Sequence, residues 1–112
     1  TKATGSVVNK RTNKAADMKA LDGPPMAVAA EDDPRVKFAD WLTDPKNPFF
    51  ARAVANRYWA HFFGRGIVDP IDDMRVTNPP SNPELLDALA KTLVDSKNSL
   101  KELVRVICKS RT

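Results

Sequence analysis

Prolines that directly follow capping residues divide this chain into short segments. Asp33-Pro34 and Asn47-Pro48 each place a helix-capping side chain before a proline at the first helical position. This order favours a helix start, because proline has no backbone N–H group to leave unpaired. Asp44-Pro45 favours the end of the first helix, since the residue before a proline avoids the helical conformation. The sequence therefore predicts a mainly α fold with about four short helices.

The segment 49–63 is predicted to be the central and most buried helix. It contains neither glycine nor proline, and Gly64 follows at the position of a helix C-cap. Helical spacing gives one apolar stripe with aromatic residues beside it: Ala51, Val54, Ala55, Tyr58 and Phe62 form the stripe, and Phe50, Trp59 and Phe63 flank it. Apolar side chains around so much of the circumference indicate burial on several sides.

Two more helices are predicted to form an antiparallel hairpin at the C-terminal end. Ser81 with Glu84, and Ser99 with Glu102, have the spacing of capping boxes. Apolar residues follow each start at helical spacing: Leu85, Leu86, Leu89 and Leu93, then Leu100, Leu103, Val104 and Ile107. The short turn over residues 95–98 between them favours antiparallel packing of the two helices.

Residues 1–30 differ from the rest and are predicted to form an extended arm or a weak β-hairpin. Val7-Val8 can form a strand and residues 9–14 a turn, and Met18, Ala20 and Leu21 can form a short return strand or an extended run. An isolated hairpin is marginally stable in water, so this arm is expected to pack on something. The predicted organisation is an arm over residues 1–30 and a helical domain over residues 31–112.

The segment 64–82 is predicted to be a long loop, because three prolines and two glycines resist regular structure. A loop of this length in a small domain is usually either functional or packed by its own side chains. Its apolar residues favour the packed version: Ile67, Val68, Ile71, Met74 and Val76.

Composition excludes several classes of protein. The length of 112 residues indicates one small domain, and no apolar run approaches the roughly 20 residues of a membrane span. Cys108 is the only cysteine and His61 the only histidine, which excludes a disulfide framework and a multi-histidine metal site within the chain. The net charge of +4 is spread over alternating basic and acidic blocks, a pattern that makes nucleic-acid binding an unfavoured alternative.

Several longer runs of residues resemble one known family. They are Asp40–Arg52, Asn56–Gly66, Asp69–Arg75, Asn78–Asp87, the ending Ile107–Thr112 and, more loosely, Val7–Lys14. Over about residues 5–112 the chain resembles the planctomycete-specific domain of unknown function, called the PSD domain, of large cytochrome-c-associated proteins.

The resemblance implies a piece of a much larger, exported protein and an extracytoplasmic location. It also implies upstream domains of the same polypeptide as partners, with a c-type haem domain among them and other extracytoplasmic proteins as further candidates. The family brings no established activity. Covalent haem attachment needs a Cys-x-x-Cys-His sequence, and Cys108 stands alone, so no cofactor is expected in this chain.

One cluster of polar residues could carry chemistry. Arg57 and His61 lie four residues apart on the predicted central helix, next to Asn56, and Asp72 and Asp73 follow in the loop. The functional interpretation is a cleft in which His61 acts as acid or base beside the carboxylates. The structural interpretation, which we favour, is that Arg57, Arg65 and Arg75 pair with these carboxylates and fix the loop to the helix.

Other candidate sites are weaker. Asp69, Asp72 and Asp73 could bind Ca²⁺, but their spacing does not match an EF-hand, and no metal is expected. Cys108 lies beside the apolar face of the last helix and is expected to be a buried, inert thiol. A crowded set of aromatic residues could form the core, a ligand pocket or an interface: Phe38, Trp41, Phe49, Phe50, Tyr58, Trp59, Phe62 and Phe63.

Three functional hypotheses follow. The first is a non-catalytic structural or interaction module of a larger exported protein. The second is one part of a redox or hydrolytic enzyme whose site is completed by other domains. The third is nucleic-acid binding. Whether this chain is itself catalytic is left open at this point.

Overall fold

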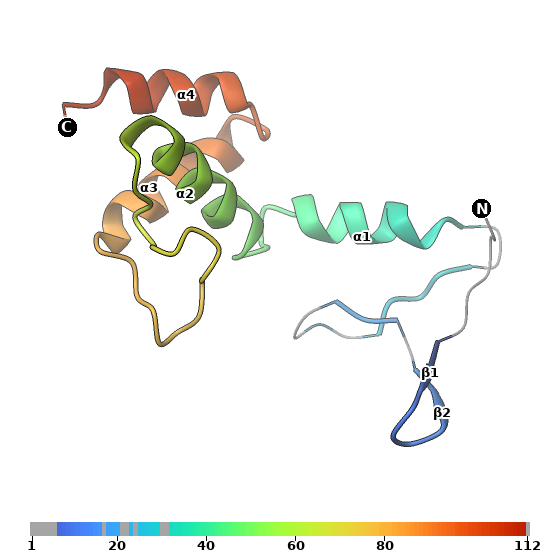
Figure 1. Cartoon of the computed structure of the whole chain (residues 1–112). Helices are drawn as coiled ribbons and strands as arrows, with labels where there is room; N and C mark the ends of the chain where they lie inside the picture. Colours follow the sequence, from blue (N-terminus) through green and yellow to red (C-terminus); the bar gives the residue numbers. More distant parts are fainter. Residues whose placement is uncertain (1–6, 17, 21–22, 24, 30–31, 112) are drawn as a thin grey trace. The chain divides into compact units, whose positions relative to one another are not determined.

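The structure is a computed structural model that describes residues 7–16, 18–20, 23, 25–29 and 32–111. It contains two strands and four helices, and it divides into two compact units, Thr1–Asp44 and Pro45–Thr112 (Figure 1). The predicted mainly α fold with an N-terminal hairpin is confirmed. The predicted division into residues 1–30 and 31–112 stays a prediction. None of the helices in the described ranges is long and apolar enough to cross a membrane.

The first unit begins with an antiparallel hairpin of β1 (Val7–Asn9) and β2 (Lys14–Ala16). The return strand is Lys14–Ala16, so the strand alternative at Met18 and Ala20 is wrong, whereas the alternative of an extended run stays a prediction; Leu21 lies outside the described residues. The turn is tighter than predicted because the Asn9 side chain accepts hydrogen bonds from the backbone N–H groups of Arg11 and Thr12. Asn13 completes the turn in the left-handed conformation, with φ of 53°.

Helix α1 (Pro34–Thr43) starts and ends as the sequence predicts. The Asp33 side chain accepts a hydrogen bond from the backbone N–H of Arg35, and Asp44 is the C-cap. Phe38 and Trp41 lie on the same face and their ring centroids are 5.7 Å apart. The helix has no buried residue.

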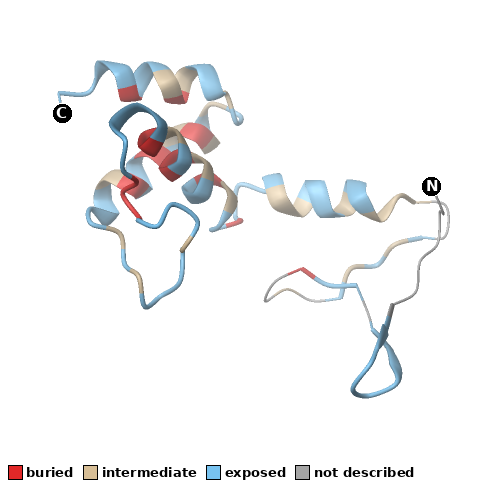
Figure 2. Cartoon of the chain, viewed as in Figure 1, coloured by how far each residue is buried: buried red, intermediate tan, exposed pale blue. Residues whose placement is uncertain are grey.

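The second unit consists of α2 (Phe50–Phe63), α3 (Pro83–Asp95) and α4 (Leu100–Lys109), with the loop 64–82 between α2 and α3. α2 packs against α3 and α4, and the C-terminal helix hairpin is confirmed. Buried residues lie where the three helices face one another (Figure 2). The core of this unit contains Ala51, Ala55, Trp59, Ile67, Val68, Leu86, Leu89, Ala90, Leu93, Leu103 and Ile107.

α2 is the helix around which this core is built, but its buried face differs from the predicted stripe. The helix begins at Phe50, with Phe49 as N-cap, two residues after the predicted first position Pro48. Asn47 instead accepts hydrogen bonds from the N–H groups of Phe49 and Phe50 in the turn before the helix. The helix ends at Gly64 as predicted, where φ is 75° and the Gly64 N–H donates to the Ala60 carbonyl. Phe62 was expected in the stripe and is exposed, as is Phe63 beside it. The buried face is centred on Ala51, Ala55 and Trp59. The two alanines are small and allow the neighbouring helices to approach closely.

Two predictions about the C-terminal helices need correction. Asn82 caps α3 by accepting a hydrogen bond from the Leu85 N–H at 3.0 Å, whereas Ser81 does not cap this helix. The Ser99 cap on α4 is confirmed. Cys108 is exposed, not buried, because Leu103 and Ile107 occupy the buried face and Cys108 lies one position further around the helix.

Candidate functional site

The loop 64–82 is joined to α2 through the side chain of Asn56, which is completely buried. The Asn56 Oδ1 accepts a hydrogen bond from the Val68 N–H at 2.8 Å. Its Nδ2 donates to the carbonyls of Val68 and Ile71, each at 2.9 Å. The amide thereby both accepts from and donates to the loop backbone, as the backbone of a neighbouring strand would. These hydrogen bonds satisfy backbone groups that burial would otherwise leave unpaired.

Gly66 is the residue that makes room for this arrangement. A Cβ atom at position 66 would lie 2.2 Å from the Val68 carbonyl oxygen and about 3 Å from both polar atoms of the Asn56 amide. Any larger residue would therefore displace the loop from Asn56. The sequence identifies Gly64 as a helix end, but it gives no signal for the close approach at Gly66.

Further hydrogen bonds close the loop on itself. The backbone N–H and the Oγ of Ser81 both donate to the Ile67 carbonyl, at 2.8 and 2.9 Å. The Asn78 Nδ2 donates to the carbonyls of Asp73, at 3.0 Å, and of Asp69, at 3.3 Å. Long loops in small domains need such internal anchors to hold one conformation.

The predicted packing of the loop by its own apolar side chains is only half correct. Ile67 and Val68 are buried in the core, whereas Ile71, Met74 and Val76 are exposed. The reason is that Asn56 and Ser81 hold the start and end of the loop, and its middle projects into solvent. The anchors are thus mainly polar.

Arginine–carboxylate pairs surround the loop, as the structural interpretation predicts, but only one of these three pairs joins the loop to α2. Arg57 on α2 pairs with Asp72 and ties the helix to the loop. Arg65 with Asp69 and Arg75 with Asp73 are local pairs within the loop. The Arg75 guanidinium, through its hydrogen bonds, lowers the pKa of the Asp73 carboxyl.

The candidate catalytic residues are divided between different environments. Arg57 and Asp72 contact each other, while Asn56 faces the interior and Asp73 pairs with Arg75. His61 is exposed and packs edge-on against the Phe62 ring, with centroids 5.2 Å apart. An acid–base role for His61 stays a prediction.

A metal site is not evident in the part of the chain that the structure describes. There, no group of three or more histidine, cysteine or acidic side chains could hold an ion. Asp69, Asp72 and Asp73, the residues considered for Ca²⁺, each pair with a different arginine.

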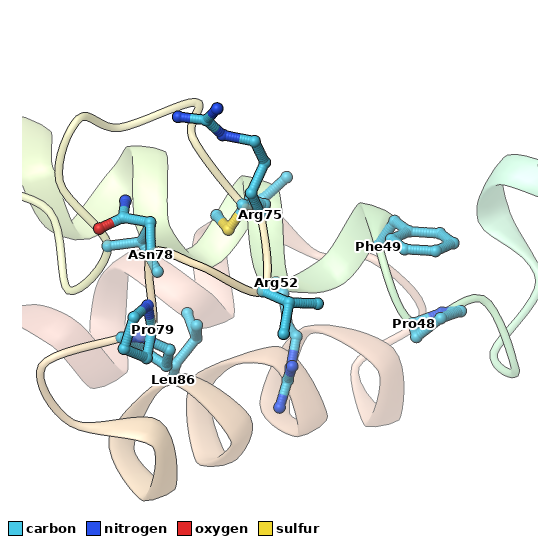
Figure 3. Close-up of a pocket in the computed structure, with 12 residues that line it drawn as sticks. Pro48, Phe49, Arg52, Arg75, Asn78, Pro79 and Leu86 are labelled. Carbon is cyan, nitrogen blue, oxygen red and sulfur yellow. The ribbon is translucent and has the colours of Figure 1, made fainter.

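The loop and the start of α2 together enclose an apolar pocket of about 380 Å³, which we call the loop pocket (Figure 3). Its size lies within the usual range of ligand and peptide sites. It is lined by Pro48, Phe49, Arg52, Ala53, Val68, Met74, Arg75, Val76, Asn78, Pro79, Pro80 and Leu86. The loop pocket could not be predicted from the sequence, because periodicity does not reveal which apolar residues of an irregular loop face solvent.

The charged residues of the loop pocket are already neutralised. Arg52 pairs with Asp87 on α3, and Arg75 pairs with Asp73. Their guanidinium groups point away in opposite directions (Figure 3). Both arginines therefore present only their methylene groups to an occupant of the pocket. The lining is thus apolar and electrically neutral.

The fold and the loop pocket define a small helical domain with a structured, solvent-facing loop. A family model, PSD1, described as a protein of unknown function (DUF1553), matches residues 34–112. The chain therefore belongs to the PSD1 family, as the resemblance in sequence indicates. No curated protein and no solved structure matches the chain.

Proposed function

We propose that this chain is a non-catalytic interaction module of a larger, exported polypeptide, and that the loop pocket receives an apolar segment from another part of that polypeptide. The module needs no cofactor of its own in this role. The c-type haem domains expected from the family resemblance would then be neighbours in the same polypeptide.

The observation that carries this proposal is the exposure of apolar residues around the loop pocket. Val76 is 99% exposed, and Phe49 and Met74 also face solvent at its edge. Single exposed apolar residues are common on protein surfaces, but a cluster of them around a pocket is typical of an interface. The neutral lining favours an uncharged, apolar occupant over a charged ligand.

The anchoring of the loop supports the same role. Asn56 and Ser81 hold both ends of the loop through hydrogen bonds to its backbone. A pocket wall that is fixed in advance loses little conformational entropy when an occupant binds. The polar network at this site therefore has a structural purpose in presenting the loop pocket.

The proposal can be tested by mixing the 112-residue chain with the remainder of the longer polypeptide and measuring their association by calorimetry. Met74→Ser should weaken binding about tenfold, because the side chain that lines the pocket is lost. Ile71→Ser is the matched control, since Ile71 is on the same loop, is also 37% exposed, and does not line the loop pocket. Equal affinities for both variants, or no association, would contradict the proposal.

The enzymatic alternative has its own test. An activity and ligand screen on the longer polypeptide, repeated with His61→Ala, asks whether the one histidine takes part in catalysis. Under the interaction proposal, any activity found is unchanged by this substitution, while Met74→Ser still reduces association. A loss of turnover in folded His61→Ala would favour the enzymatic alternative.

A further inference from the structure

A second apolar groove lies in the same unit, between α2 and the turn that joins α3 to α4. We call it the helix groove; its volume is about 230 Å³. It is lined by Phe50, Val54, Tyr58, Leu93, Asn98 and Leu100. It shares no lining residue with the loop pocket, so the two surfaces can be altered separately.

The helix groove has the composition of a recognition site. Phe50, Val54 and Tyr58 are spaced by four residues, so they form one half-buried face of α2. The Tyr58 hydroxyl and the Asn98 side-chain amide make no hydrogen bond to any residue in the described part of the chain. An apolar surface with a few free polar groups, one of them from a tyrosine, is typical of interface centres.

Two unpaired lysines of this unit lie next to the helix groove in the sequence. Six of its acidic residues are already paired with a basic residue: Asp69, Asp72, Asp73, Asp87, Asp95 and Glu102. Among the described residues of this unit, Lys97, Lys101, Lys109 and Arg111 are basic and have no acidic partner. Lys97 and Lys101 directly adjoin the lining residues Asn98 and Leu100, and both are exposed.

We propose that the helix groove binds an acidic amphipathic peptide segment, whose apolar side chains occupy the groove and whose carboxylates pair with Lys97 and Lys101. Charge complementarity selects this occupant, because the apolar lining excludes a wholly charged ligand and the adjoining lysines disfavour a basic one. Helical segments commonly bind such grooves through apolar residues at positions i, i+3, i+4 and i+7. Five of the six arginines that the structure describes in this unit are already paired with carboxylates, which disfavours nucleic acid: Arg52, Arg57, Arg65, Arg75 and Arg105.

The test uses the 112-residue chain and a fluorescent synthetic peptide with leucines at those four spacings and glutamates on both sides. A second peptide carries glutamine in place of every glutamate. Fluorescence anisotropy should show that the glutamate peptide binds more tightly, by roughly tenfold at low salt. Val54→Gln or Leu100→Gln should weaken binding about tenfold, and Lys97→Gln or Lys101→Gln about two- to fivefold each.

Two control variants lie on α4 away from the helix groove. Val106→Gln matches Leu100→Gln, since the two residues are 42% and 44% exposed, and Lys109→Gln removes the same charge as Lys101→Gln. Both controls should keep at least half of the affinity. The substituted lysines are exposed, so their replacement should leave the fold intact. Circular dichroism of each variant checks that any loss of binding is not caused by misfolding.

The proposal is overturned if neither peptide binds, if the two peptides bind equally, or if the controls weaken binding as much as the groove variants do. Tighter binding of a duplex DNA oligonucleotide, reduced equally by Lys101→Gln and Lys109→Gln, would point to nucleic acid instead and would also overturn it. Each of these results leaves the loop pocket proposal untouched, because Met74 is not part of the helix groove.

Discussion

Asn56 shows how a single polar residue can determine the course of a long loop. Its side chain is fully buried and makes three hydrogen bonds to the backbone of Val68 and Ile71. From the sequence, an asparagine next to Arg57 on an apolar helix fits a polar cleft as well as a structural anchor. The sequence does not separate these two interpretations, because the partners of Asn56 are backbone groups, and backbone groups leave no signal in the sequence.

Asn56→Ala should lower the free energy of unfolding by about 2–4 kcal/mol, since it leaves one buried N–H group and two carbonyls without a partner. Urea unfolding measures this loss. Arg57→Gln is the control, because it removes an exposed ion pair to the same loop and should cost less than about 1 kcal/mol. Similar losses for the two variants would show that the Asn56 amide is not the main anchor.

The two glycines that follow α2 should respond differently to alanine. Gly66→Ala should cost about 2 kcal/mol or more, because its Cβ would meet the Val68 carbonyl oxygen at 2.2 Å. Gly64→Ala should cost about 1 kcal/mol, since a Cβ there has nothing within 4 Å and only the positive φ is unfavourable. Thermal unfolding of both variants checks the order, and the reverse order would rule out the close approach at Gly66.

At the scale of the elements, helix ends are the features that the sequence predicts best. Asp33, Gly64 and Ser99 all occupy the capping positions expected of them. There are two exceptions. α2 has Phe49 as its N-cap, without a side-chain cap, whereas the sequence predicts Asn47 as the cap. At α3, Ser81 has the right spacing to cap, but Asn82 does so. Ser81 donates instead to the Ile67 carbonyl, a contact made across the loop that local spacing could not reveal.

The cap of α1 makes a prediction about pH. Hydrogen bonds from the Arg35 side chain, and then from its backbone N–H, lower the pKa of Asp33 from 3.8 to about 2. Because the folded-state pKa is lowered, the contribution of Asp33 is fully present above about pH 4 and is lost as pH falls through about 2. An NMR titration of the Asp33 carboxyl should have its midpoint near 2, and Arg35→Gln should raise that midpoint toward 3.8. A midpoint near 3.8 in the unsubstituted chain would contradict this account.

The face that α2 buries could be predicted only in part. The apolar stripe correctly includes Ala51 and Ala55, but it extends to Phe62, which is exposed. Helical periodicity identifies apolar positions without showing which of them a neighbouring helix reaches. Alanines allow close contact, so they fix the buried face more firmly than the larger side chains around them.

At the scale of the whole molecule, the second unit combines a compact helical core with surfaces that remain apolar and open. The core residues of α3 and α4 follow directly from leucine spacing, so most of this fold was predictable. The loop pocket was not, because it depends on the path that Asn56, Gly66 and Ser81 impose on the loop. The central claim is that this path presents the pocket to another part of a longer polypeptide.

Hydroxyl-radical footprinting tests that claim most directly, by comparing the 112-residue chain with the longer polypeptide in which we propose that it acts. Phe49 and Met74, which line the loop pocket, should react in the isolated chain and become protected by about tenfold in the longer polypeptide. Phe63, which is exposed and does not line the loop pocket, is the internal control and should keep its reactivity. Equal reactivity of Phe49 and Met74 in both proteins would contradict the account, because the loop pocket would then be empty in the assembled protein.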